Sequence, residues 1–128
     1  MRLLLDTNVL IWSLADPDRL PKDARNLLED PHNTAFFSAA SIWEIAIKAG
    51  MGRINFQINP PALAEFAVAA GFVELPVHSS VAIMVAALPP HHKDPFDRLL
   101  VAQAMAEPAI LLTADSQLSA YSELVRLV

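Results

Sequence analysis

Arg2-Leu3-Leu4-Leu5-Asp6-Thr7-Asn8-Val9-Leu10 begins the chain with an apolar run that leads directly into an acidic residue. Residues 2–5 have the length and composition of a short buried strand. In residues 7–14 the apolar side chains recur at near-helical spacing, which favours a helix. This stretch therefore predicts a strand and a helix joined by a turn that holds Asp6.

The same alternation of strands and helices continues along the chain. Further strands are expected at residues 34–37, 72–75, 110–112 and 124–128, and an extended segment at residues 53–59. Further helices are expected at residues 21–28, 41–49, 61–70, 79–88 and 95–106. Short apolar strands separated by helices predict a parallel sheet that helices cover on both faces. Binding groups should then gather where strands end and helices begin.

Length and composition indicate one folded domain spanning residues 1–128. The hydrophobic content is 54% with only 3 glycines, which argues against disorder. Cysteine is absent, so any metal must use oxygen or imidazole ligands, and a reducing, cytoplasmic location is expected. We expect no signal peptide and no membrane association, because no apolar run approaches the roughly 20 residues of a membrane span.

Four acids occupy strand-exit or helix-entry positions. Asp6 follows the first strand, and Glu44 lies one turn into the helix after the second strand. Asp97 opens a later helix, and Asp115 follows a late strand. In a parallel sheet these positions share one edge, so side chains far apart in sequence converge there. The sequence thus predicts a single acidic cleft.

Crowded carboxylates raise one another's pKa unless a cation lies between them. Oxygen ligands select hard ions such as Mg²⁺ or Mn²⁺, which can polarise a phosphodiester and activate water, either as one ion or as a pair. The net charge of −5 at first disfavours a nucleic acid partner. Without the four acids, however, 10 acidic residues face 9 basic ones, and a bound cation would supply charge where phosphate must lie.

Each acid also has a purely structural interpretation. Ser41-Ile42-Trp43-Glu44 fits a capping box, and Asp94-Pro95-Phe96-Asp97 fits a helix cap followed by a first-turn proline and a charge that suits the helix dipole. Asp6 and Asp115 are also suited to capping. Taken singly, the acids are better explained as caps, and only their joint placement favours a site.

Four segments together resemble the PIN-domain family, and within it the VapC-type toxins. They span nearly the whole chain, and the third is the most distinctive: Leu3-Leu4-Leu5-Asp6-Thr7-Asn8-Val9-Leu10, Ser38-Ala39-Ala40-Ser41-Ile42-Trp43-Glu44-Ile45-Ala46-Ile47-Lys48, His92-Lys93-Asp94-Pro95-Phe96-Asp97-Arg98-Leu99-Leu100-Val101-Ala102-Gln103-Ala104 and Leu112-Thr113-Ala114-Asp115. The resemblance implies a three-layer α/β/α sandwich with a central, mainly parallel sheet. It also implies an Mg²⁺- or Mn²⁺-dependent endoribonuclease that leaves 5′-phosphate and 3′-hydroxyl ends, forms a homodimer and is inhibited by a VapB-type antitoxin.

Transferred by position, the family's acids fall on Asp6, Glu44, Asp97 and Asp115, with Asp6 and Asp97 expected nearest the metal. Supporting roles are expected for Thr7 and Asn8, which would orient Asp6 or a bound water, for Ser116 beside Asp115, and for Asp94, whose role stays open between helix cap and water-mediated metal contact. Phosphate contact and ordinary surface solvation are weighed equally for four basic residues, Lys48, Arg53, Lys93 and Arg98.

Histidine and tryptophan residues offer weaker signals. Neighbouring His91 and His92 would rarely direct both rings to one ion, so an exposed loop is expected there. Trp12 and Trp43, like Phe96, are expected in the core or at a subunit interface rather than stacked on bases. Three other functions remain as alternatives: a PIN scaffold that binds RNA or a protein without cutting, a metal phosphatase, and a receiver-like phospho-acceptor domain. The receiver-like alternative is weak, because this sequence has neither the acceptor aspartate after a central strand nor the lysine after a later one.

Overall fold

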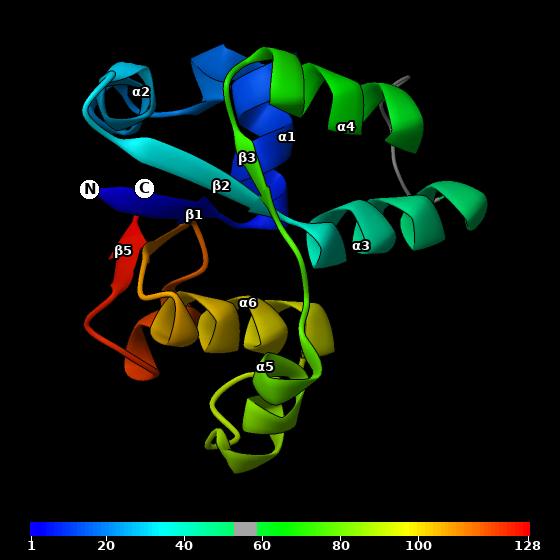
Figure 1. The fold of residues 1–128 in the computed structure, drawn as a ribbon, viewed down its shortest axis with the longest axis vertical. Coiled ribbons are helices and arrows are strands. Elements are labelled where there is room, and N and C mark those ends of the chain that lie inside the picture. Colours follow the sequence, from blue (N-terminus) through cyan, green and yellow to red (C-terminus); the bar gives the residue numbers. More distant parts are fainter. Residues whose placement is uncertain (53–58) are drawn as a thin grey trace.

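A five-stranded parallel sheet forms the centre of the computed structural model, which describes residues 1–52 and 59–128 (Figure 1). The strands lie in the order β3-β2-β1-β4-β5, and each pairs with its neighbour in parallel. Their bounds are β1 (Arg2–Leu5), β2 (Thr34–Ser38), β3 (Val73–Leu75), β4 (Ile110–Thr113) and β5 (Val125–Leu127). All five predicted strands are present, and the mainly parallel sheet is confirmed.

The helices alternate with the strands as predicted. They are α1 (Thr7–Ala15), α2 (Lys22–Glu29), α3 (Ala39–Gly50), α4 (Pro60–Ala69), α5 (Ser79–Met84) and α6 (Pro95–Ala106), with 3-10 turns η1 (Pro17–Arg19), η2 (Val85–Ala87) and η3 (Ser116–Ala120). The expected extended segment at residues 53–59 falls almost wholly outside the described residues. In the described part of the chain, no helix has both the length and the hydrophobicity to cross a membrane.

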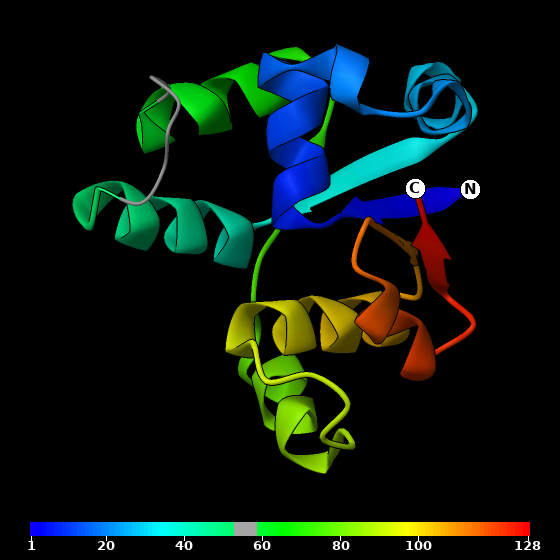
Figure 2. The same cartoon turned by 180° about the vertical axis from the view of Figure 1, so that it is seen from behind.

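Alternate residues of each strand serve two different cores. Leu3 and Leu5 of β1 pack with α1, α2 and α4, whereas Leu4 between them packs with α6 and η3. The same alternation separates Phe37 from Phe36 in β2, as expected when successive strand side chains point to opposite faces. Figures 1 and 2 show α1, α2 and α4 on one side of the sheet and α6 on the other. The three-layer α/β/α sandwich is thus confirmed.

Two helix ends differ from the predicted bounds by more than one residue. Helix α3 begins at Ala39 rather than at residue 41, because the Ser38 hydroxyl accepts a hydrogen bond from the Ala40 amide and caps the helix earlier. The helix expected over residues 79–88 tightens into a 3-10 turn at Val85–Ala87. Pro89 and Pro90 follow, and proline both disfavours a helical residue before it and cannot donate to the helix ladder.

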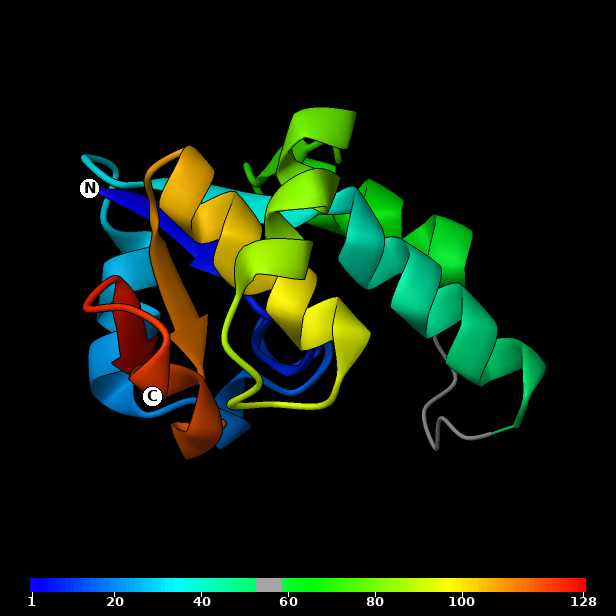
Figure 3. The same cartoon turned by 90° about the horizontal axis from the view of Figure 1, so that it is seen from below.

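The strand order places a switch point beside β1. The chain passes from β1 outward to β2 and β3, and then crosses back to β4 on the other side of β1. In Figure 3, seen from below, α6 makes this return along one face of the sheet. Ligand sites of open parallel sheets lie outside the carboxyl ends of the strands at such a point. Here those ends lead into Asp6 and Asp115.

Candidate active site

All four predicted acids line one pocket of about 240 Å³ at the carboxyl edge of the sheet. These acids lie far apart in the sequence. They meet in space because β1, β2 and β4 all end at this edge of the sheet, and α6 begins there. The described residues that line it are Asp6, Thr7, Asn8, Glu44, Lys48, Asp94, Asp97, Ala114 and Asp115. Among these, five carboxylates share the pocket with one basic side chain.

Asp6 joins the end of β1 to the start of α1. Its backbone N–H donates to the Leu112 carbonyl of β4 at 3.0 Å, and its Oδ1 accepts from the Val9 amide at 2.8 Å. Asp6 is thus a helix cap and also a pocket residue, so the two interpretations of its carboxylate are compatible. The pKa of Asp6 is raised to about 6, mainly by burial and also by the charges of Glu44 and Asp115, while hydrogen bonds from Thr113 and Val9 oppose the shift.

Glu44 is only 4% exposed and faces the pocket from α3. The Thr7 hydroxyl donates to its Oε1 at 2.6 Å and also lies 3.0 Å from the Ser41 hydroxyl oxygen. The Lys48 ammonium donates to Oε2 from one turn further along α3, and this bond raises the pKa of Lys48. The capping-box interpretation is wrong, because Ser38 caps α3 and both Ser41 and Glu44 lie inside the helix.

Asp94 and Asp97 enter the pocket from the start of α6. Asp94 Oδ1 accepts from the amides of Phe96 at 2.8 Å and Asp97 at 3.2 Å, so its capping role is confirmed. Asp97 follows in the first turn. The pKa of Asp97 is raised to about 7, mainly by burial and also by the charges of Asp94, Asp6 and Glu44, while His92 opposes the shift.

Asp115 caps the short turn η3 and is held from two sides. Its Oδ1 accepts from the Gln117 amide at 3.0 Å, and its Oδ2 lies 2.7 Å from Nε2 of His92. His92 is largely buried, with a side-chain exposure of 13%, and its Nε2 also lies 3.6 Å from Asp97 Oδ2. The exposed loop position expected for His92 is therefore wrong, and the sequence interpretation missed a residue of the site.

The chemistry of the pocket fits a hard divalent cation. Its ligand candidates are carboxylate oxygens, which Mg²⁺ and Mn²⁺ prefer. The raised pKa values of Asp6 and Asp97 reflect burial together with mutual repulsion, which positive charge in the pocket would relieve. Among the described residues, Lys48 hydrogen-bonds to Glu44 and to no other carboxylate of the pocket. It therefore acts on the charges of Asp94 and Asp97 only at longer range.

The family model of the PIN domain matches residues 3–124, nearly the whole chain. This chain belongs to the PIN domain family. No curated protein sequence gives a significant match. Among solved structures, the chain is similar to VapBC2 from Rickettsia felis bound to a promoter DNA fragment, with a TM-score of 0.73, 17% identity, and coverage of 100% of this chain and 98% of that chain.

Two further structures share the PIN-domain fold. A toxin–antitoxin complex from Klebsiella pneumoniae gives a TM-score of 0.63 at 21% identity and covers 97% of this chain and 95% of that one. FitAB bound to a DNA fragment named IR36 gives 0.61 at 18% identity, with coverage of 98% and 94%. At these identities the likeness establishes the fold.

The residues expected to support the PIN-domain acids are placed differently from one another. Thr7 contacts Glu44, whereas the sequence interpretation gave Asp6 or a bound water as its partner. Asn8 lines the pocket and is exposed, while Ser116 is an exposed residue at the start of η3 outside the pocket lining. Thr113, which the sequence interpretation did not single out, is buried and accepts a hydrogen bond from the Asp115 amide at 3.0 Å.

Of the four basic residues for which phosphate contact and surface solvation were weighed equally, one is described in the lining of the PIN-domain pocket. That residue is Lys48; Lys93 is exposed and lies outside the lining, and Arg53 falls outside the described residues. The Arg98 guanidinium donates to the carbonyls of Val85 at 3.0 Å and Leu88 at 3.1 Å, so it holds the end of the α5 segment.

The two tryptophans of this PIN domain have different environments. Trp12 packs against the core on the α1 side, as expected. Trp43 is 60% exposed, so it is not a core residue of this chain, and its ring meets Phe96 edge to face at 5.2 Å between centroids. This aromatic pair joins α3 to the start of α6, the two helices that carry Glu44 and Asp97.

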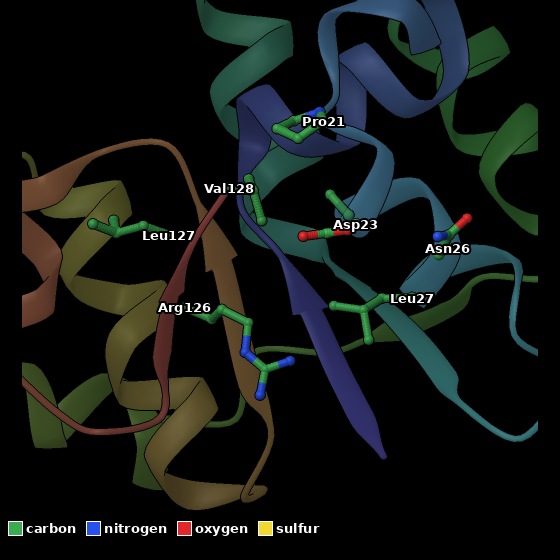
Figure 4. A pocket seen from close by; sticks show the side chains of 8 residues that line it. Pro21, Asp23, Asn26, Leu27, Arg126, Leu127 and Val128 are labelled. Atoms are coloured by element: carbon green, nitrogen blue, oxygen red, sulfur yellow. The ribbon is translucent and has the colours of Figure 1, made fainter.

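A larger pocket, of about 490 Å³, lies away from the acids between α2 and β5 (Figure 4). Among the described residues that line this pocket, Asp23 is the one acidic residue and Arg126 is the one basic residue. Since a cluster of carboxylates is missing from this lining, the smaller acidic pocket is the better candidate for phosphodiester chemistry.

Proposed function

We propose that the protein is a metal-dependent endoribonuclease and the toxin of a toxin–antitoxin pair. The observation that carries the proposal is the meeting of Asp6, Glu44, Asp97 and Asp115 in one pocket, although up to 109 positions separate them in sequence. Such convergence is unnecessary for capping, which each acid could perform alone. It is expected for a site that must hold a cation beside a phosphate.

The four carboxylates would hold Mg²⁺ or Mn²⁺, and two of them, Asp6 and Asp97, are buried or partly buried acids with raised pKa values. A bound cation would polarise the phosphodiester, activate water and stabilise the leaving oxygen. Asp6 is fixed by the Val9 amide, and Glu44 by Thr7 and Lys48, so both present their oxygens in set directions. This preorganisation favours one fixed geometry at the phosphate that is attacked. The 5′-phosphate and 3′-hydroxyl ends are what the family resemblance implies for the products.

Lys48 would bind an RNA phosphate at the mouth of the pocket. Its side chain is 42% exposed while its ammonium contacts Glu44, so it can reach substrate without leaving the site. Asn8 lines the same pocket and offers an amide to a bound water or to the ribose–phosphate backbone. Lys93, which is exposed outside the pocket lining, is proposed as an outer phosphate contact. A phosphate contact by Arg53, which lies outside the described residues, stays a prediction from the sequence.

The toxin assignment is supported by two comparisons: membership of the PIN domain family and a likeness in fold to proteins described as VapBC2 and as a toxin–antitoxin complex. We therefore propose a VapB-type antitoxin as inhibitor, a homodimeric assembly and action on cytoplasmic RNA. Purified protein should elute at twice the monomer mass of 14.0 kDa in size-exclusion chromatography.

Cleavage of defined RNAs by wild type, Asp6→Asn and Asp97→Asn tests the nuclease proposal. The wild type should cut in Mg²⁺ or Mn²⁺ and lose activity in EDTA, whereas either variant should lose at least about 100-fold in rate, as expected for removal of an electrostatic catalytic group. Asp23→Asn, in the other pocket, is the matched control and should cut normally. If the Asp6→Asn variant cut RNA at the rate of the wild type, the assignment would be refuted.

The same assay separates the proposed function from its alternatives. A wild-type protein that binds RNA or an antitoxin but cuts no RNA in either metal would be a silent PIN scaffold. Hydrolysis of a small phosphoester without cleavage of RNA would identify a phosphatase instead.

A further inference from the structure

We propose that His92 is a positioning residue of the acidic site and not one of its metal ligands. This inference rests on the proposed metal-dependent cleavage and narrows its ligand set to carboxylates. Distance alone would suggest the opposite, because His92, Asp97 and Asp115 each place one potential ligand atom within 4.8 Å of the others. The hydrogen bonds of the imidazole ring distinguish the two roles.

The two ring nitrogens of His92 have different partners. Nδ1 accepts a hydrogen bond from the Asp94 backbone N–H at 2.9 Å, so Nδ1 carries a lone pair and no proton. A neutral imidazole then carries its proton on Nε2. Nε2 lies 2.7 Å from Asp115 Oδ2, which is the distance of a charge-assisted hydrogen bond to a carboxylate.

This tautomer prevents His92 from binding a metal through Nε2. A metal ligand must offer a lone pair, and the Nε2 lone pair is absent as long as that nitrogen holds the proton. Ligation would require the proton to move to Nδ1, where it would face the Asp94 N–H at 2.9 Å. The Asp94 amide, fixed at the N-cap of α6, therefore selects the donor role for Nε2.

The loop around His92 is fixed independently of that ring. The His92 backbone N–H donates to the Tyr121 hydroxyl at 2.9 Å, and the His91 ring meets the Tyr121 ring edge to face at 5.0 Å. His92 is thus held against the segment that follows η3. Its ring serves to orient Asp115, whose other oxygen is already fixed by the Gln117 amide.

Two consequences follow for the proposed reaction. Asp115 presents its remaining lone pairs to the pocket in one orientation, because both of its oxygens accept hydrogen bonds. The ligand set contains oxygen only, which keeps the preference for Mg²⁺ and Mn²⁺ over the softer cations that imidazole would favour.

A pair of variants separates the two hydrogen bonds of the ring. The amide oxygen in His92→Asn takes the place of Nδ1 and keeps the Asp94 bond, but no donor reaches Asp115. The amide nitrogen in His92→Gln takes the place of Nε2 and keeps the donor to Asp115. We expect His92→Asn to lose about 10- to 100-fold in cleavage rate, the usual effect of removing an outer-shell partner, and His92→Gln to recover most of that loss. His32→Asn, at an exposed histidine in the turn before β2, is the control and should cut RNA at the wild-type rate.

Spectroscopy tests the tautomer without relying on activity. The ¹⁵N spectrum of the His92 imidazole, assigned by comparison with His92→Asn, should have the pattern of an Nε2-protonated ring both without metal and in saturating Mg²⁺. In Mn²⁺-loaded protein, pulsed electron paramagnetic resonance should detect no directly coordinated nitrogen. Nitrogen coordination that disappears in His92→Asn, or an Nδ1-protonated ring, would overturn the proposal.

The outcomes also separate this inference from the proposed function. If the wild type cuts no RNA but His92 retains the Nε2-protonated pattern, the nuclease assignment fails and the orientation of Asp115 by His92 stands. If the wild type cuts RNA and His92→Gln is as inactive as His92→Asn, the positioning role fails while the nuclease stands. Thermal unfolding of both variants identifies a loss that arises from misfolding.

Discussion

The Thr7 hydroxyl donates a hydrogen bond of 2.6 Å to Glu44 Oε1 and thereby joins the start of α1 to α3. Both side chains are buried, with exposures of 7% and 4%. Buried carboxylates are costly unless hydrogen bonds or opposite charges satisfy them. The contact therefore has a structural role as well as a place in the pocket, and the two can be separated experimentally.

Thr7→Val should destabilise the protein because it leaves a buried carboxylate oxygen without its donor while keeping the side-chain shape. The expected loss in free energy of unfolding is about 1–3 kcal/mol, measured by urea denaturation. Thr7→Ser retains the hydroxyl and should lose less. Equal stability of Thr7→Val and wild type would contradict a structural role for this bond.

Asp97→Asn should stabilise the metal-free protein, even though we expect the same substitution to impair the proposed cleavage. The carboxylate is held in an environment that raises its pKa to about 7, so keeping it ionised above that pH opposes folding. A neutral carboxamide removes the repulsion from Asp94 and Asp6. We therefore expect the free energy of unfolding to rise by on the order of 1–2 kcal/mol at pH 8, which is part of the free energy that corresponds to the raised pKa.

Chemical denaturation in EDTA at pH 8 measures this gain. Asp23→Asn, which replaces an exposed acid on α2, is the control and should change stability by no more than about 0.5 kcal/mol. A clear destabilisation by Asp97→Asn would mean that the acidic cluster is not under electrostatic strain.

The stability of the metal-free protein should depend on pH through Asp6 and Asp97. Both folded-state pKa values, about 6 and about 7, lie above the ordinary value of 3.8. The folded state therefore binds protons more tightly than the unfolded state between pH 4 and 7. The contribution of these groups to stability is fully present below about pH 4 and is lost as pH rises through 6 and 7.

Thermal unfolding in EDTA across pH 4–8 would reveal this loss as a falling Tm. The double variant Asp6→Asn/Asp97→Asn should lack that part of the slope. Mg²⁺ should restore stability more strongly at pH 8 than at pH 5, because protons and the cation compete for the same oxygens. A slope that persists unchanged in the double variant would assign the pH dependence to other groups.

Lys48→Met should weaken RNA binding more than it slows the bound reaction. Among the described residues of the pocket lining, Lys48 is the one basic residue, and its side chain is 42% exposed. We expect a several-fold rise in KM, and the slope of log affinity against log salt should fall by about one. Lys22→Met on α2 is the control, because Lys22 lies outside the pocket lining. Equal effects of both variants would remove Lys48 from the RNA contact.

The sequence was sufficient for the sheet and for the four acids because both are recorded in local patterns. Apolar runs such as Leu3-Leu4-Leu5 identify strands, and an acid directly after a parallel strand must lie at the carboxyl edge. Convergence then follows from topology, without knowledge of any side-chain contact. The strand order of the structure supplies that topology.

Contacts between distant side chains were not predictable in the same way. The partner of Thr7 is Glu44, 37 positions away, and the direction of the His92 ring depends on the Asp94 amide and on Asp115. In sequence, His92 is simply the second of two adjacent histidines in a loop. The start of α3 was similarly ambiguous, because Ser38 and Ser41 are both good capping residues and only the fold selects Ser38.

Gln103 should hold α3 and α6 in the relative positions that bring Glu44 and Asp97 into one pocket. Its Oε1 accepts from the Ser38 hydroxyl at 2.5 Å, and its Nε2 donates to the Pro76 carbonyl at 3.3 Å, although the side chain is 1% exposed. Gln103→Met keeps the volume but leaves the Ser38 hydroxyl without an acceptor, so unfolding free energy should fall by about 1–3 kcal/mol.

The effect of Gln103→Met on cleavage distinguishes a local packing defect from a displaced helix. If Gln103 positions α3, its loss should let Glu44 move away from Asp97 and so lower the affinity for Mg²⁺, which calorimetry measures. The variant should then cut RNA more slowly, in proportion to that loss of affinity. Gln103→Glu keeps an acceptor for Ser38 but loses the donor to Pro76, and it should retain more of that affinity. A destabilised Gln103→Met protein with unchanged Mg²⁺ affinity would restrict Gln103 to the stability of the core.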